Sequence, residues 1–308
     1  MAIVLDTCVL PQKGPLRSII MSAVLRVAEK RKMAVYLPEI ALEESVSARR
    51  RSARASFDAL QAAHKEASKY FTLDPIYIPD EDEVAQKWDQ ELRGTFKIIR
   101  LYGEDASEAL RREAHRIKPA RDGIGARDSA IWLAVKRHHQ KNGGPTYFVT
   151  NNSSDFSGSN KRELHGNLSE ELGESGGADF FLFNQLDEVV TELAERADVT
   201  LKEDAIVEFE EDFVDVAMSA AVEDLNAKGD PAHFLSFMLQ PARIIRTIRS
   251  YKVDDVYLVM AEVSLSIEID HEPDDVILSK IKIRTWVEQS VESGDAIAVF
   301  AESFVRDE

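Results

Sequence analysis

Short apolar runs alternate with amphipathic segments through the first 190 residues of the chain. Four runs have the length of buried strands, and they are Ala2–Leu5, Ala34–Leu37, residues 146–150 and Phe180–Phe183. Between them, residues 15–32, 43–70 and 128–140 show helical spacing of apolar residues or a helix-forming composition. Residues 81–120 predict two or three polar helices, and the Gly/Ser/Asn-rich stretch from 151 to about 177 predicts a polar loop. Strands that alternate with helices predict a parallel sheet flanked by helices, which is an α/β fold.

The pattern changes near residue 200. Apolar positions between Ile206 and Ala220 predict an acidic amphipathic helix, and residues 234–248 predict a second helix. The period then becomes two, because apolar residues alternate with polar ones over 263–269, and segments 281–284 and 296–305 continue this pattern. We therefore expect an α+β region with a three-stranded antiparallel sheet packed on helices.

Charge divides the chain in a similar way. The net charge of the 308 residues is −17, which separates into about +4 over residues 1–170 and about −21 over residues 171–308. The mildly basic part can attract a polyanion, whereas the acidic part repels one. We assign residues 1–198 to an N-terminal domain and residues 199–308 to an acidic α+β C-terminal domain.

Composition also limits where the protein is expected to work. A single cysteine excludes an intramolecular disulfide and is typical of a reducing cytoplasm. No apolar run approaches the roughly 20 residues that a membrane helix needs. Met1 leads directly into an apolar strand without the features of a signal peptide. We expect a cytoplasmic protein without a membrane partner, in which Cys8 is a small buried residue.

Acidic and amide side chains stand where predicted strands end or helices begin. Asp6 follows the first strand, Glu44 lies on the helix after the second, and Asp128 opens the helix over 128–140. Asn152 and Asp155 follow the strand over 146–150. The carboxyl ends of parallel strands meet at one edge of a sheet, so these side chains are expected to converge. Clustered carboxylates require a cation, and Mg²⁺ or Mn²⁺ suits oxygen ligands.

These motifs, in this order, resemble those of the PIN-domain ribonucleases, and in particular the larger bacterial PIN-like proteins. The likeness rests on Leu5-Asp6-Thr7, on Leu37 to Glu44, on Gly123 to Trp132 and on Val149 to Asn152. It covers roughly the first 190 residues and implies a PIN-like sheet and a metal-dependent endoribonuclease that hydrolyses single-stranded RNA. Asp6, Glu44 and Asp128 would then hold Mg²⁺ or Mn²⁺, with Asp155 or Asn152 completing the site.

The chain departs from the family pattern at two positions. Cys8 stands where the family usually has an Asn that supports the first Asp. Asn152 stands where the fourth acid is usual, so either Asn152 orients a water or Asp155 enters the site through a bend in the loop. On the second segment Glu44 fits the family pattern best, and Glu43 is the alternative. Each acid by itself has an ordinary explanation, because Asp caps helices well and Glu often lies on a solvated helix face.

Basic residues near these motifs are candidates for contacts with the RNA backbone. They are Arg49, Arg50, Arg54, Arg127 and Lys136. Contacts of this kind position a nucleic acid without reading its sequence. The alternative is a solvated helix face for the first three, and a pair with a neighbouring carboxylate for Arg127.

Two other functions remain open from the sequence. The first is a catalytically degenerate PIN-fold module that binds RNA or protein, which Cys8 and Asn152 favour. The second is a toxin or defence nuclease that is restrained by its own acidic C-terminal half. We also consider an inhibitory partner or a homo-oligomer.

Overall fold

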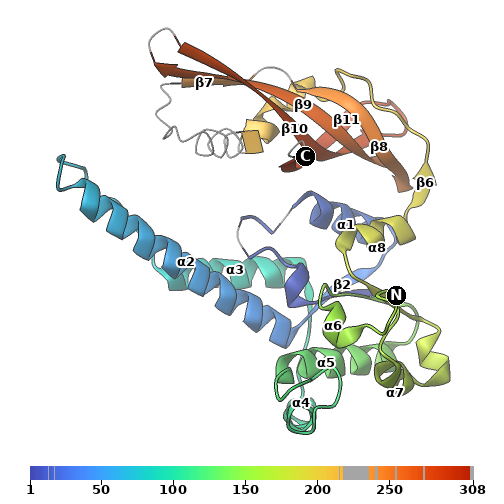
Figure 1. Cartoon of the computed structure of the whole chain (residues 1–308). Coiled ribbons are helices and arrows are strands. Elements are labelled where there is room, and N and C mark those ends of the chain that lie inside the picture. The colour runs from blue at the N-terminus through green and yellow to red at the C-terminus, as the bar shows by residue number, and fades with distance from the viewer. Residues whose placement is uncertain are drawn as a thin grey trace. The chain divides into compact units, whose positions relative to one another are not determined.

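The structure is a computed structural model, and it divides the chain into two compact units (Figure 1). The first unit is Met1–Leu16 with Arg31–Val189, and the second is Arg17–Lys30 with Val190–Glu308. The structure describes residues 1–12, 14–16, 18–214, 216–217, 236–239, 242–253, 255–272 and 275–305. The division into independent domains at residue 198 stays a prediction.

A five-stranded parallel sheet forms the centre of the first unit, in the order β3-β2-β1-β4-β5. Its strands are β1 (Ala2–Leu5), β2 (Ala34–Pro38), β3 (Lys97–Ile99), β4 (Thr146–Val149) and β5 (Phe180–Phe183). The predicted α/β class is confirmed. The short strand β3 lies where only polar helices were expected, since three residues are too few to give a periodic signal.

Burial explains why the strands carry such uniform sequences. Ile3, Val4 and Leu5 of β1 are fully buried, and all four residues of β4 are buried as well. A parallel sheet is covered on both faces, so alternation of apolar and polar residues disappears and continuous apolar runs remain. The register pairs Ala2 with both Ala34 and Thr146, so that β1, β2 and β4 end at the same edge.

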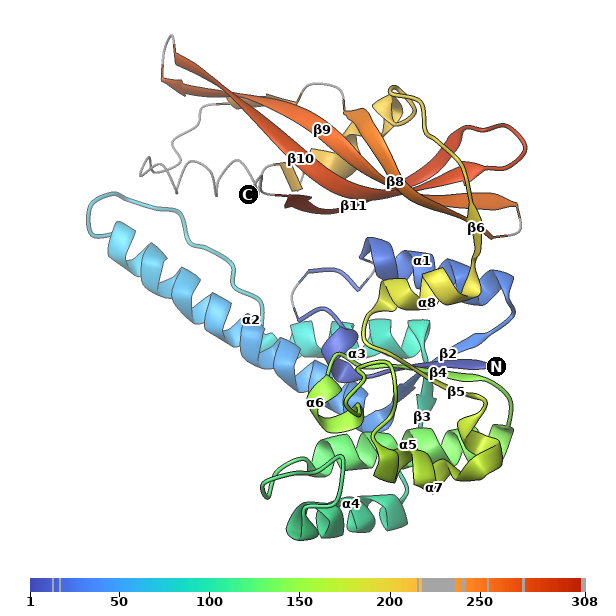
Figure 2. The ribbon, with the colours of Figure 1, turned by 45° about the vertical axis from the view of Figure 1, so that its right-hand side comes forward.

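Helices connect and cover these strands. They are α2 (Glu39–Ala67), α3 (Glu81–Thr95), α4 (Gly103–His115), α5 (Ala126–Asn142), α6 (Ser153–Phe156) and α7 (Gly166–Gly177). Helices α5 and α7 lie together on one side of the sheet, and α4 packs on α5 (Figure 2). The long helix α2 begins directly after β2 and therefore carries its first turns past the end of the sheet.

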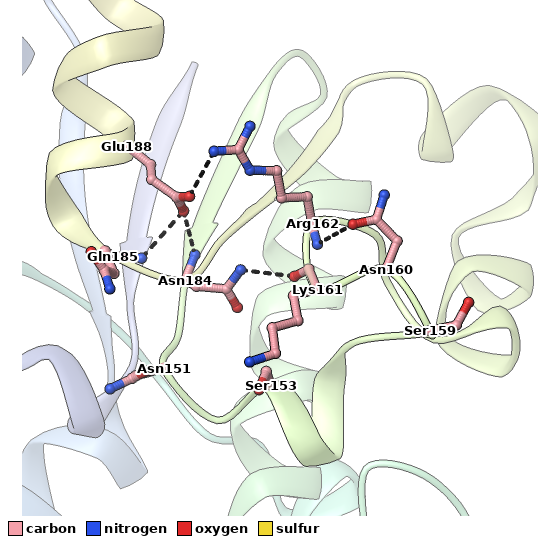
Figure 3. Close-up of a pocket in the computed structure, with 9 residues that line it drawn as sticks. All are labelled: Asn151, Ser153, Ser159, Asn160, Lys161, Arg162, Asn184, Gln185 and Glu188. Carbon is pink, nitrogen blue, oxygen red and sulfur yellow. Dashed lines mark hydrogen bonds and ion pairs between the residues drawn. The ribbon is translucent and has the colours of Figure 1, made fainter.

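Residues 151–177 were expected to form a loop, and this prediction is wrong because the segment contains α6 and α7. Its Gly, Ser and Asn content hid the helical spacing of Leu168 and Leu172, which are both buried. The remaining loop between the two helices is fixed to the end of β5, since Asn184 Nδ2 donates to the carbonyl of Lys161 at 2.8 Å (Figure 3).

The second unit contains an antiparallel sheet in the order β11-β10-β9-β8-β6, with β7 also paired to β9. Its strands are β6 (Glu195–Ala197), β7 (Ser236–Leu239), β8 (Arg243–Val253), β9 (Val256–Glu272), β10 (Asp275–Ser290) and β11 (Ala296–Val305). The expected antiparallel α+β character is confirmed. The sheet is larger than the three strands that the sequence predicted, because β6, β7 and β8 also belong to it.

The prediction of a helix over residues 234–248 is wrong, since strands β7 and β8 occupy the described part of that range. Strand β8 contains two shifts of register against β9, between Ile244 and Arg246 and between Thr247 and Arg249. Each shift inserts an extra residue, which breaks the period of two and imitates helical spacing. The segment expected to be helical from Ile206 begins as a 3₁₀ helix η2 (Val207–Phe213) and is α-helical at Val214, Val216 and Ala217, while Ala220 lies outside the described residues.

The helix predicted over residues 15–32 exists as α1 (Ile19–Lys30), but it belongs to the second unit. It contacts β10 and β11, and Arg26 pairs with Glu288 of β10 at 2.7 Å. The local sequence does not show that α1 belongs to the second unit, because an amphipathic helix does not specify which sheet covers its apolar face. Among the helices of the described residues, none is both long and apolar enough to cross a bilayer.

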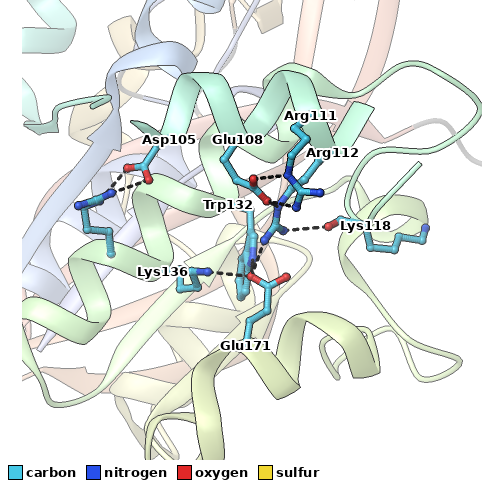
Figure 4. Close-up of polar contacts among 9 residues, drawn as sticks. Asp105, Glu108, Arg111, Arg112, Lys118, Trp132, Lys136 and Glu171 are labelled. Atoms are coloured by element: carbon cyan, nitrogen blue, oxygen red, sulfur yellow. Dashed lines mark hydrogen bonds and ion pairs between the residues drawn. The ribbon is translucent and has the colours of Figure 1, made fainter. Parts of the chain in front are cut away.

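One acidic side chain joins three helices of the first unit (Figure 4). Glu171 of α7 accepts hydrogen bonds at one oxygen from Arg112 of α4 at 2.8 Å, from Lys136 of α5 at 2.9 Å and from Trp132 of α5 at 3.1 Å. Burial alone would raise the pKa of Glu171, but these donors outweigh it and lower the pKa below 4.5. The carboxylate therefore stabilises the packing of α4 and α7 on α5.

Replacing this carboxylate is expected to destabilise the protein. Glu171→Ala leaves the buried guanidinium of Arg112 without its partner on α7, and we expect the free energy of unfolding to fall by about 3 kcal/mol. Because the folded pKa of Glu171 is lowered, its stabilisation is present above pH 4.5 and is lost as the pH falls further. Urea unfolding followed by circular dichroism tests this, with the exposed neighbour Glu170→Ala as the control. Equal losses in the two variants would contradict the role of Glu171.

Candidate functional site

The carboxyl edge of the parallel sheet holds a pocket of about 230 Å³. Asp6 follows β1, Glu44 lies on the second turn of α2, Asp128 lies in the first turn of α5, and Asn152 follows β4. All four side chains line this pocket. The tertiary structure thus brings together four of the five residues that the sequence placed at this edge.

Asp6 is the most buried member, with 3% of its surface exposed. Its Oδ1 accepts from the backbone N–H of Thr7 at 2.6 Å, and its Oδ2 accepts from the Thr150 hydroxyl at 2.6 Å. Burial raises the pKa of the Asp6 carboxyl, these hydrogen bonds oppose the rise, and the charge of Glu44 adds to it. Because Thr150 follows β4, this contact fixes Asp6 across the β1–β4 pair.

Cys8 is not the buried residue that the sequence predicted, because it is exposed at the pocket. Its thiol nevertheless faces inward and donates to Asp6 Oδ2 at 3.3 Å, while the backbone N–H of Asn151 donates to the sulfur at 3.0 Å. Desolvation and the charge of Asp6 raise the pKa of this thiol to about 12. Cys8 therefore supports Asp6 as a hydrogen-bond donor.

Glu44 rather than Glu43 faces the pocket, whereas Glu43 is exposed on α2. One oxygen of Glu44 accepts from the Thr7 hydroxyl at 2.8 Å, and the other pairs with Arg127 at 2.7 Å. The Arg127 side chain is 72% exposed, so solvent screens this ion pair and makes it weak.

Gly125 determines where α5 begins and therefore where Asp128 lies. Its φ is +110°, and a Cβ at this position would lie 2.9 Å from the Cα of Ala120, so only glycine is compatible with this turn. Asp128 then projects into the pocket, and Asn152 Nδ2 donates to its Oδ1 at 3.0 Å. Desolvation, followed by the charges of Asp6 and Asp155, raises the pKa of Asp128 to about 6.

Asp155 lies near this cluster but does not line the pocket. It is buried, and its Oδ1 lies 2.9 Å from Nε of Arg121. Arg121 belongs to the loop before α5, as does Lys118, whose ammonium donates to the carbonyl of Ser154 at 2.9 Å. The sequence analysis missed both cations, although their position just before the glycine loop was the available signal.

The predicted RNA-binding cations occupy different environments. Arg49 donates to the carbonyl of Gly14 at 2.6 Å and lies 4.5 Å from the Trp88 ring centroid. Arg50 pairs with Asp82 at 2.7 Å. Arg54 is exposed on α2 and has no ion pair with any described residue.

Lys136 was expected to contact RNA, but its ammonium donates to Glu171 and its side chain is only 21% exposed. It contributes to the packing of α5 on α7, and we remove it from the candidate interface. Arg50, Arg54 and Arg127 are the exposed members of the predicted set.

The donor set of the pocket matches a hard divalent cation, since it consists of carboxylate and amide oxygens. The carboxylates lie close enough for their charges to raise the pKa values of Asp6 and Asp128, in addition to the larger effect of burial. Within the described residues, no three His, Cys, Asp or Glu side chains are arranged to hold a metal ion as they stand. Glu44 is turned toward Arg127, and Asp128 toward Asn152. Coordination would require Glu44 to exchange Arg127 for the ion.

The raised pKa of Asp128 predicts a measurable destabilisation of the metal-free protein. A carboxyl with a pKa of 3.8 when unfolded and about 6 when folded stabilises the native state only at low pH, and this contribution is lost as the pH rises through 6. Asp128→Asn removes the charge, so we expect a gain of about 1 kcal/mol above pH 6, or ~2–4 °C in Tm. The gain should vanish in acid, and Asp122→Asn, at an exposed position in the loop before α5, is the control. A lower Tm for Asp128→Asn in the presence of a chelator would contradict this.

Comparison with known proteins agrees with this geometry. The family model described as PIN domain matches residues 3–156, which is half of the chain. No curated protein and no solved structure matches the sequence significantly. The matched region contains β2, β4, all of β1 but its first residue, and the four candidate residues that line the pocket. PIN domains have a nuclease-type fold. The chain therefore belongs to the PIN-domain family.

Proposed function

We propose that this protein is a metal-dependent endoribonuclease that hydrolyses phosphodiester bonds of single-stranded RNA. The observation that carries the proposal is the pocket at the carboxyl edge of the sheet, where Asp6, Glu44, Asp128 and Asn152 meet. Asp6 and Asp128 have raised pKa values in part because neighbouring acids repel them. A site that brings several acids together against their mutual repulsion favours a bound cation, because the cation neutralises their negative charge.

Asp6, Glu44 and Asp128 would hold Mg²⁺ or Mn²⁺. When bound, the ion supplies an activated water and neutralises charge on the phosphate. Asp6 is suited to a fixed position, because hydrogen bonds from Thr7 and Thr150 leave its carboxylate little freedom. Asn152 orients Asp128 through its amide N–H.

Arg127 is suited to contact the substrate. Its guanidinium is mostly exposed, and Glu44 is its one ion-pair partner among the described residues. Arginine binds phosphate oxygens with two parallel hydrogen bonds. We propose that Arg127 leaves Glu44 for a phosphate of the RNA, which frees Glu44 for the cation. Arg54 would contact the RNA backbone farther along α2.

For the fourth position of the site we favour Asn152 over Asp155. Asn152 lines the pocket and contacts Asp128, while Asp155 pairs with Arg121 outside the lining. Asp155 then acts through its charge, which raises the pKa of Asp128.

The second candidate is a catalytically degenerate module that binds RNA or protein. The amide at Asn152 and the lack of a ready-made metal group among the described residues favour it. A toxin or defence role, restraint by the acidic C-terminal part and a regulatory homo-oligomer are finer proposals that rest on the charge division of the sequence alone.

The two candidates differ in their response to divalent ions. We expect Mg²⁺ or Mn²⁺ at about 100 times Kd to stabilise the native state by ~2.7 kcal/mol, which raises Tm. Glu44→Gln should reduce this shift and lower the rate of cleavage of single-stranded RNA by about a hundredfold or more. Glu43→Gln is the matched control, since Glu43 is exposed on the same turn of α2. Wild-type protein that neither binds the ions nor cleaves RNA would support the degenerate module instead.

Variants at the fourth position test the choice between Asn152 and Asp155. Asn152→Asp adds a carboxylate to the pocket, so we expect tighter binding of Mn²⁺ and a further rise in the pKa of Asp128. Asp155→Asn should change metal affinity less than threefold, or about 0.6 kcal/mol. Calorimetric titration with Mn²⁺ measures both. If Asp155→Asn abolishes metal binding while Asn152→Asp has no effect, the assignment is reversed.

A further inference from the structure

A second polar pocket in the first unit is lined in part by the chain neighbours of a candidate-site residue (Figure 3). Its volume is about 510 Å³, compared with about 230 Å³ for the candidate site, and all nine residues that line it are polar. Asn152 lines the smaller pocket, while its chain neighbours Asn151 and Ser153 line the larger one. Residues 151–153 therefore border both pockets.

Hydrogen bonds keep the walls of this second pocket in place. Glu188 accepts from the backbone N–H of Asn184 at 2.8 Å with one oxygen and from Arg162 at 3.1 Å with the other. Asn184 Nδ2 donates to the carbonyl of Lys161 at 2.8 Å, which connects the end of β5 to the loop before α7. The pocket is therefore a built feature of the fold, with walls from three separate segments.

Several polar groups of the pocket have no partner among the described residues. The side chains of Asn151, Lys161 and Gln185 are exposed and make no hydrogen bond or ion pair there. The Lys161 ammonium extends toward Asn151 and Ser153 (Figure 3). Asn184 Oδ1 is buried and accepts no hydrogen bond, although buried acceptors are normally paired.

The chemistry of these groups suits a nucleotide. Lys161 and Arg162 outnumber Glu188, which leaves one positive charge for a phosphate. Carboxamides both donate and accept, and in this way they recognise the edges of unpaired bases. Asn151 and Gln185 offer two free carboxamides, each two residues after the end of one of the neighbouring strands β4 and β5 (Figure 3).

We propose that this pocket binds the nucleotide of a single-stranded RNA that adjoins the phosphodiester in the candidate site. The inference rests on the proposed function, since it takes the candidate site as the place of cleavage. Lys161 contacts the phosphate, while Asn151 and Gln185 contact the base. The pocket then gives the enzyme a preference for the base beside the cut, which phosphate contacts alone cannot provide.

The test removes the free groups and leaves the walls intact. The triple variant Asn151→Ala, Lys161→Ala and Gln185→Ala deletes no side-chain hydrogen bond found among the described residues. Fluorescence anisotropy with labelled homopolymeric RNA oligonucleotides, in a chelator that prevents cleavage, measures affinity for each base. We expect the variant to bind about tenfold more weakly and to lose the difference between bases.

A matched control separates this pocket from general electrostatics. Gln86→Ala, Lys87→Ala and Gln90→Ala on α3 remove the same charge and two carboxamides from exposed positions outside both pockets. We expect this variant to keep wild-type affinity and base preference. The single variant Lys161→Gln should weaken binding and reduce the salt dependence by about one counterion, which keeps the test valid if the triple variant melts early.

The outcomes distinguish the subsite from the cleavage reaction. If the triple variant keeps wild-type affinity and base preference, or if the α3 control loses as much, the subsite is overturned, whether or not the wild type cleaves RNA. If the wild type binds RNA through this pocket but cleaves none with Mg²⁺ or Mn²⁺, the subsite stands and the nuclease function is overturned. A wild type that binds no RNA overturns both.

Discussion

The parallel pairing of β1 with both β2 and β4 is the constraint on which the site depends. This pairing ends the three strands at one edge of the sheet. Asp6, the start of α2 and Asn152 therefore meet there, although they are far apart along the chain. Burial of continuous apolar runs such as Ile3-Val4-Leu5 maintains the pairing. The hydrogen bond from Thr150, which follows β4, to Asp6, which follows β1, then fixes the position of the Asp6 carboxylate relative to both strands.

Electrostatics at this edge oppose folding. Asp6 and Asp128 are held among other acids and away from water, and both pKa values are raised. The protein compensates with hydroxyl and amide donors from Thr7, Thr150 and Asn152, and with the exposed Arg127. Backbone and hydroxyl donors hold Asp6, while Glu44 is held by the Thr7 hydroxyl and the exposed Arg127. This difference is consistent with a site in which one ligand is preset and another changes partner.

Elsewhere the first unit uses charge for packing. Glu171 gathers donors from α4 and α5 on a single oxygen, and Lys136 belongs to that arrangement instead of an RNA surface. The Glu171 carboxylate has a lowered pKa, in contrast to the raised pKa values of Asp6 and Asp128. Paired cations account for the first case, and burial among like charges accounts for the second.

The sequence by itself determined the parallel α/β class, the PIN-domain family and which acids follow the strands. These features are local: an apolar run, a helix start at Gly125 and a polar residue at a strand end are each visible within a few positions. Only the tertiary structure decided that Glu44 faces the pocket while Glu43 is exposed, that Asp155 pairs with Arg121, and that α1 belongs with the second sheet. Those outcomes depend on helix rotation, loop path and the choice of packing partner. Residues distant in the chain set each of them, so local spacing does not encode them.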